Sequence, residues 1–208
     1  MTVRDLLIRT RREVAQEIWL YRSLARWVAR RPDVPSGTEP IGYARLSTPM
    51  LWLWTIGSAV EVVAVELILR SIDAAWAEAI RLPVLVLGAW GVLWMLGSLA
   101  AQKVRPHLLG STELIVRNGT RAWVRVPLAA VDQVKPFERD YPGVVKTLHH
   151  EDDAVLVGVQ LRTNLDLVFA EPTTLATSHG PLTVTRVALW VDEPRPVATR
   201  LRTPVSAV

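Results

Sequence analysis

Hydrophobic positions change their spacing along the chain and divide it into three parts. In residues 1–31 apolar side chains recur three, four or seven positions apart, as on one face of an α-helix. Two long apolar runs follow, and from His107 onward apolar and polar residues alternate with a period of two. The pattern predicts an N-terminal amphipathic helix, a pair of apolar helices and a C-terminal β domain, which is the organisation of an α+β membrane protein.

Arginines crowd the polar surface of the predicted N-terminal helix, where eight of them face only three acidic residues. Such a helix suits an anionic membrane interface, with Arg11 and Arg12 as candidate contacts for lipid phosphates. The same amphipathic pattern also fits a helix that packs on its own protein or on a partner helix, and both interpretations stay open. Residues 32–48 contain three prolines and two glycines and are expected to form a linker.

The next segment, residues 49–101, predicts a hairpin of two transmembrane helices. Residues 82–101 carry no charge over a length that crosses a hydrocarbon core of about 30 Å. Residues 50–69 have a similar length and many Leu, Val and Ile residues but include Glu61 and Glu66, each of which costs roughly 2 to 4 kcal/mol if it is ionised at mid-bilayer. We interpret this run as a second span, joined to the first by a short connection at residues 71–80.

Basic residues set the expected orientation of the hairpin. Cations are abundant in the N-terminal segment and follow the second span at Lys103 and Arg105, whereas the connection holds arginines only at its edges. Both termini are therefore expected in the cytoplasm and the chain in the cell (inner) membrane. No cleavable secretory signal is expected, since the first apolar run begins about 50 residues into the chain.

The period-two region, residues 107–203, predicts a small β-barrel or sandwich of six or seven strands closed by a C-terminal helix. The firmest element is a hairpin around Asn118 and Gly119, a dipeptide that tolerates the positive φ of a tight turn. The other expected strands are residues 131–134, 154–162, 165–170 and 182–191, with turns at residues 163–164 and a loop containing Pro172. A helix is expected from Pro194 to about Leu201, capped by Asp192.

The order of these segments resembles a known family. A pair of spans, then LLGSTELIVRNG, AWVRVPLAAVDQV, VQLRTNLDLVFAEP and VALWVDEPRPVATRLRT, is similar to the membrane-tethered bacterial pleckstrin-homology-like domains of the actinobacterial type. The resemblance implies a bent antiparallel sheet closed by a C-terminal helix. It also implies an interaction or lipid-facing module, and it supplies no catalytic activity.

Two carboxylates inside a predicted span are the foremost candidate site. Glu61 and Glu66 are five residues apart, about 140° around a helix, so they do not form one paired site, whereas Ser58 shares a side with Glu61. One interpretation is a proton or cation site. The alternative is a carboxylate that faces Arg81, a subunit contact or headgroup water.

Other polar clusters point less clearly to chemistry. Arg117, Arg121 and Arg125 near the predicted hairpin are candidate contacts for anionic lipid, or else solvated cross-strand charges. The run of possible metal ligands at residues 149–153 is interpreted as a solvated loop, because neighbouring side chains on a strand point in opposite directions.

Composition and missing motifs exclude several classes of protein. Among the 208 residues half are apolar, 21% are charged and mean hydropathy is +0.23, which excludes intrinsic disorder as the default state. The chain has no cysteine, and none of the common nucleotide-binding, hydrolase or metalloprotease motifs is present. We therefore expect no enzyme, cofactor, metal site or nucleic-acid partner.

The leading functional hypothesis is a membrane-anchored interaction or scaffold module that binds a protein partner or its own copies. The membrane and anionic lipid headgroups are its other expected partners. The alternative is a small transport or channel component that uses Glu61 in an oligomeric bundle.

Overall fold

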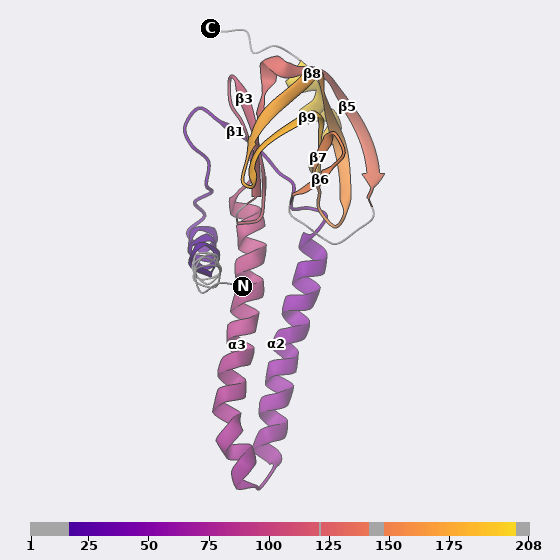
Figure 1. Cartoon of the computed structure of the whole chain (residues 1–208). Helices are drawn as coiled ribbons and strands as arrows, with labels where there is room; N and C mark the ends of the chain where they lie inside the picture. The colour runs from indigo at the N-terminus through magenta and orange to yellow at the C-terminus, as the bar shows by residue number, and fades with distance from the viewer. Residues whose placement is uncertain (1–16, 121, 142–147, 203–208) are drawn as a thin grey trace, which may run out of the picture. The chain divides into compact units, whose positions relative to one another are not determined.

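The computed structural model describes residues 17–120, 122–141 and 148–202 (Figure 1). The chain forms an α+β structure with two compact units. One contains the N-terminal helix and Thr48–Ala101, and the other contains Arg30–Ser47 together with the chain from Gln102 onward.

Two long apolar helices dominate the first unit and lie side by side in Figure 1. Helix α2 spans Thr48–Ser71 and helix α3 spans Ala75–Val104, so both predicted apolar helices are present and each is longer than expected. The connection between the two helices is shorter than the expected residues 71–80, because α3 already begins at Ala75. By length and composition both helices are able to cross a membrane.

The described part of the N-terminal helix, residues 17–28, packs on this pair of helices. Its Leu20 is buried against Gly97 of α3, and the rings of Trp27 and Trp52 lie 6.3 Å apart. Part of the predicted apolar stripe nevertheless stays exposed, with Ile18 at 62% and Val28 at 76%. The helix therefore contacts its own protein through one face and leaves a second apolar face uncovered by the described residues.

In the described residues of the second unit the strands form one mixed sheet of nine strands that does not close, so the expected barrel or sandwich of six or seven strands is wrong. The path runs β1-β2-β3-β4-β8-β9-β7-β6, and β5 pairs with β8. All pairs are antiparallel except β7 with β9, which is parallel and departs from the antiparallel sheet that the resemblance implies. The strands are β1 Glu39–Ile41, β2 His107–Leu109, β3 Glu113–Asn118, β4 Ala122–Pro127, β5 Val131–Asp140, β6 His149–Glu151, β7 Ala154–Val157, β8 Arg162–Thr177 and β9 Gly180–Leu189.

The hairpin around Asn118 and Gly119 is confirmed, since β3 and β4 pair up to Asn118 and Ala122 and Gly119 has a φ of 61°. The expected strand over residues 154–162 is wrong in its second half. Gln160 and Leu161 both have positive φ and form a two-residue turn between Val159 and Arg162, which exchange two hydrogen bonds of 3.0 Å. The turn expected at residues 163–164 lies within β8 instead.

Two further expectations fail at prolines. Pro172 lies inside β8 rather than in a loop, and the β8–β9 register shifts between Val168 and Thr173 to accommodate it. The strand expected at residues 131–134 continues through Pro136 as β5. The residues expected to form a linker contain β1, which pairs with β2.

The larger of two apolar clusters in the described residues has Leu114, Val124, Leu165 and Val187 among its fully buried members. The C-terminal helix α4, Pro194–Arg202, adds Val197 to this core, as the expected closing helix should. The carboxylate of Asp192, expected to cap α4, instead accepts a hydrogen bond of 2.8 Å from the backbone N–H of Arg45.

The packing of the N-terminal helix is testable at one glycine. A Cβ at Gly97 would lie 1.7 Å from Cδ2 of Leu20, so we expect Gly97→Ala to displace residues 17–28 at a cost of about 1 to 3 kcal/mol. The chain has no cysteine, so spin labels on cysteines introduced at the exposed Ala25 and Ala89 report the displacement as a changed distance distribution.

Gly91→Ala is the matched control, because its added Cβ meets no atom within 4 Å. The expected distribution for this variant equals that of the unsubstituted chain. Identical distributions for both alanine variants would contradict the described packing.

Candidate functional site

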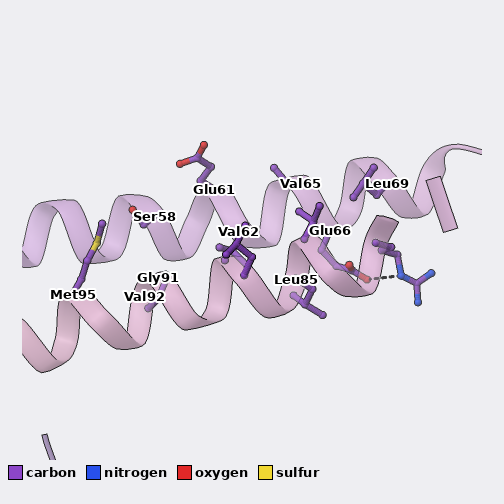
Figure 2. Close-up of a pocket in the computed structure, with 14 residues that line it drawn as sticks. Ser58, Glu61, Val62, Val65, Glu66, Leu69, Leu85, Gly91, Val92 and Met95 are labelled. Atoms are coloured by element: carbon purple, nitrogen blue, oxygen red, sulfur yellow. Dashed lines mark ion pairs between the residues drawn. The ribbon is translucent and has the colours of Figure 1, made fainter. Parts of the chain in front are cut away.

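A cavity of about 300 Å³ lies between α2 and α3 and contains the carboxylates singled out in the sequence (Figure 2). Its polar lining comes from four residues, Ser58, Glu61, Glu66 and Arg81. The rest of its wall is apolar or glycine. The lining residues of α3 extend from Arg81 to Met95, so the cavity follows the helix pair for roughly 20 Å at about 1.5 Å per residue.

The structure places Glu66 against Arg81, with Oε1 of the carboxylate 3.2 Å from Nε of the guanidinium. Figure 2 draws this ion pair as a dashed line and shows the Glu66 side chain directed toward α3. The second oxygen, Oε2, is buried and has no hydrogen-bond partner among the described residues. Glu66 therefore faces Arg81, and an ion pair with Arg81 is one of the alternatives to a proton or cation site.

Glu61 lies differently from Glu66, as their spacing predicts. Its side chain is exposed and points away from α3 in Figure 2. Within the described part of the chain no residue forms an ion pair or hydrogen bond with the Glu61 carboxylate. Ser58 lines the same cavity and is partly buried. The structure therefore brings Ser58 and Glu61 to one groove and pairs Glu66 with a cation.

The arginines expected to contact anionic lipid lie in two different environments. The side chain of Arg117 is 13% exposed, and its Nη1 donates to the backbone oxygen of Asp33 at 3.0 Å. The side chain of Arg125 is exposed, and it lies 3.6 Å from the Glu113 carboxylate and over the Trp123 ring. Arg125 has the arrangement of a solvated cross-strand charge. Arg11, Arg12 and Arg121 lie outside the described residues.

Asp33 is the centre of a polar cluster that sequence reasoning missed. Its Oδ2 lies 3.6 Å from Nε of Arg105 and 3.5 Å from Nη1 of Arg117, and its backbone N–H donates to the oxygen of Val104 at 2.8 Å. Arg105 also donates to the backbone oxygens of Gly119 and Thr120. The cluster fastens the segment before α2 to the sheet and to the residue at which α3 ends.

Beside this cluster His107 and Tyr43 stack within the buried interior, with ring centroids 4.6 Å apart. Nδ1 of His107 accepts from the backbone N–H of Arg117 at 2.9 Å, so Nε2 carries the proton and donates to the oxygen of Trp190 at 3.0 Å. Burial lowers the pKa of His107 from 6.5 to about 4. Burial likewise raises the pKa of Tyr43 to about 12 while its hydroxyl accepts from Gly119 N–H. Both rings are therefore neutral at physiological pH.

A second buried carboxylate belongs to Asp166 on β8. Its Oδ2 lies 3.4 Å from Arg186 and 3.6 Å from Arg139, and burial raises its pKa in spite of both cations. The loop expected at residues 149–153 is wrong in its first part, because residues 149–151 form strand β6. Asp152 occupies a turn at positive φ, and the Asp153 carboxylate accepts a hydrogen bond from the Thr185 hydroxyl. In the described ranges no group of three or more metal-binding side chains comes together.

Comparison with family models, with curated proteins and with solved structures gives no match for this chain.

The burial of His107 predicts a pH dependence of stability. Because its pKa in the folded state is depressed to about 4, protons bind the unfolded chain first, and stability falls as pH decreases from about 6.5 to about 4. The full contribution is about 3 kcal/mol. Urea unfolding of the full chain in detergent, followed by the circular dichroism of the sheet, measures it.

His107→Gln supplies the control for this measurement. It retains a donor and an acceptor but no titrating ring, so we expect lower stability at pH 7 and a weaker pH dependence between pH 6.5 and 4. Equal slopes for both proteins would show that another group causes the dependence.

Proposed function

We propose that this chain is a non-enzymatic membrane-anchored interaction module of the cell membrane. In this proposal α2 and α3 cross the bilayer as a hairpin, and the β unit lies on the cytoplasmic side, where it binds a protein partner or its own copies. The proposal keeps the likeness to bacterial pleckstrin-homology-like domains, which the sheet followed by a core-packed α4 supports.

The pairing of β1 with β2 is the observation that carries the hairpin topology. Ile41 precedes α2 and pairs with His107, which follows α3. Two strands hydrogen-bond only when they lie on the same side of a membrane. The chain must therefore enter and leave the bilayer on one side, which an even number of spans satisfies.

The surfaces of α2 and α3 support insertion. Large apolar side chains are exposed along both helices, and in water such a surface has no cover. The exposed ones are Met50, Leu53, Trp54, Ile56, Val60, Val63, Leu67, Ile68, Trp76, Ile80, Leu82, Val86, Leu87, Trp90, Leu93 and Trp94. The exposed Ile18 and Val28 of the N-terminal helix extend the apolar surface to a segment that we place in the lipid interface.

The outer edge of β5 is the proposed docking surface for a protein partner. Among the described strands β5 pairs with β8 alone, which leaves its other edge open. Near α4 this edge is restricted, because Arg202 donates to the oxygen of Val134 and Pro136 has no N–H. Beyond Pro136 the Phe137 ring is 52% exposed, so the second half of β5 offers an edge and an apolar anchor to an extended peptide.

A transport or channel component is the second candidate, because Glu61 is one of the residues beside the cavity between α2 and α3 and its carboxylate is exposed. The apolar wall of that cavity and the pairing of Glu66 with Arg81 favour a binding surface over an ion path. Purified chain in liposomes is expected to conduct no protons or small cations. A flux lost in Glu61→Gln would favour transport.

Topology is the first test of the proposal. We expect a reporter fused after Val208 to locate to the cytoplasm and a reporter inserted at Ala74 to locate to the opposite side, since charged residues flank the spans asymmetrically. Paired phosphatase and fluorescent-protein fusions measure this in cells. A β unit outside the cytoplasm, or both fusions on one side, would contradict it.

Partner binding is tested by photo-crosslinking in intact membranes. A photoreactive phenylalanine analogue at Phe137 is expected to crosslink a protein, and Phe137→Asp to reduce recovery of that protein with the full chain at least tenfold. The same analogue at the exposed Glu171 of β8 is the control and is expected to give no product. Products at Glu171 but not at Phe137 would place the docking surface elsewhere.

A further inference from the structure

Glu61 occupies the position at which an uncovered carboxylate is hardest to accommodate in a bilayer. This inference rests on the proposed insertion of α2. At about 1.5 Å per residue Glu61 lies roughly 20 Å from Thr48 and roughly 15 Å from Ser71, close to the middle of the helix. Its side chain is exposed and has no partner among the described residues. Acyl chains offer a carboxylate neither a cation nor a hydrogen-bond donor, so the position calls for a polar group from another molecule.

The surface beside Glu61 is a groove that admits another helix. The cavity continues past Glu61 to Ser58 on α2 and to Gly91 on α3. A Cβ added at Gly91 would meet no atom within 4 Å, so this side of α3 is open, whereas a Cβ at Gly88 would lie 2.6 Å from Val62 in the contact between the two helices. Small residues along such a groove let a helix backbone approach closely.

Helices α2 and α3 of a second copy of this chain do not supply the missing charge. The basic residues of α2 and α3 are Arg70, Arg81 and Lys103, and each lies within roughly 9 Å of a helix end at about 1.5 Å per residue. Arg81 is in addition paired with Glu66. A copy that docked through α2 and α3 would therefore bring Glu61 opposite another carboxylate or an apolar surface.

We propose that the groove between α2 and α3 binds a transmembrane helix of another protein that carries a lysine or arginine at the depth of Glu61. The cation pairs with the Glu61 carboxylate, and the apolar faces of that helix cover the cavity wall around Ser58 and Gly91. A buried pair satisfies both charges, whereas each alone in hydrocarbon has no counterion.

The experiment uses the full chain in liposomes and a synthetic leucine-rich transmembrane helix with one central lysine as the probe. A donor dye on a cysteine introduced at the exposed Ser71 and an acceptor on the probe report association by energy transfer. We expect the lysine probe to bind about tenfold more tightly than the same helix with leucine at its centre. A probe with the lysine moved two turns toward its end is expected to bind like the leucine helix.

Variants of the chain complete the test. Glu61→Gln and Glu61→Leu are both expected to bind the lysine probe only as well as the leucine helix, and Arg70→Gln, which changes a charge at the end of α2, is expected to bind it like the unsubstituted chain. Equal binding of lysine and leucine probes by the unsubstituted chain would overturn the proposal. Self-association of the labelled chain that is lost in Glu61→Gln would overturn it in favour of a second copy.

Failure here is distinguishable from failure of the proposed function. The reporter fusions and the crosslink at Phe137 test insertion and docking on the β unit without reference to Glu61. If those results stand and the lysine probe shows no preference, only the intramembrane partner is rejected. If the fusions place α2 outside the bilayer, the premise of a buried carboxylate fails with it.

Discussion

The pairing of β1 with β2 is the constraint on which the rest of the structure depends. These two strands of three residues each are separated in the chain by the whole of α2 and α3. Their hydrogen bonds alone would be weak, and the polar cluster of Asp33 with Arg105 and Arg117 reinforces them. The sheet therefore includes chain segments from before α2 and from after α3.

The polar cluster beside β1 and β2 combines charges that pair with one another and a buried ring that is hydrogen-bonded. Asp33 faces two guanidinium groups, and His107 uses both ring nitrogens. A partly satisfied network of this kind would destabilise the sheet, because an unpaired buried polar group costs its full desolvation energy. The low pKa of His107, about 4, fits this arrangement, because a neutral imidazole adds no positive charge beside Arg117.

Local patterns predict the elements whose cause is local. The hairpin at Asn118 and Gly119 follows from residues that accept positive φ, and the apolar lengths of α2 and α3 follow from composition. The turn at Gln160 and Leu161 could not be predicted, since neither residue type signals a left-handed backbone. The alternation of valines before it was indistinguishable from a longer strand.

Contacts between distant segments could not be predicted for a different reason. Arg117 and Asp33 are 84 residues apart, and a single aspartate among prolines gives no sign of its partners. Part of the candidate site could be predicted from the sequence. The five-residue spacing of Glu61 and Glu66 correctly separated the two carboxylates, and Arg81 was foreseen as a possible partner for a carboxylate.

The contrast between the three carboxylates separates structural from functional roles. Asp33 and Glu66 each have a basic partner within the described chain, so their charges are accounted for by the fold itself. Glu61 has none, although its helix could have placed the carboxylate toward α3, as it does for Glu66 one and a half turns later. A fold that pairs Asp33 and Glu66 with basic residues but leaves the Glu61 carboxylate on an outward face does not offset the cost of Glu61 within the described chain. The physical account of that residue therefore lies in what covers α2, and not in the stability of the hairpin.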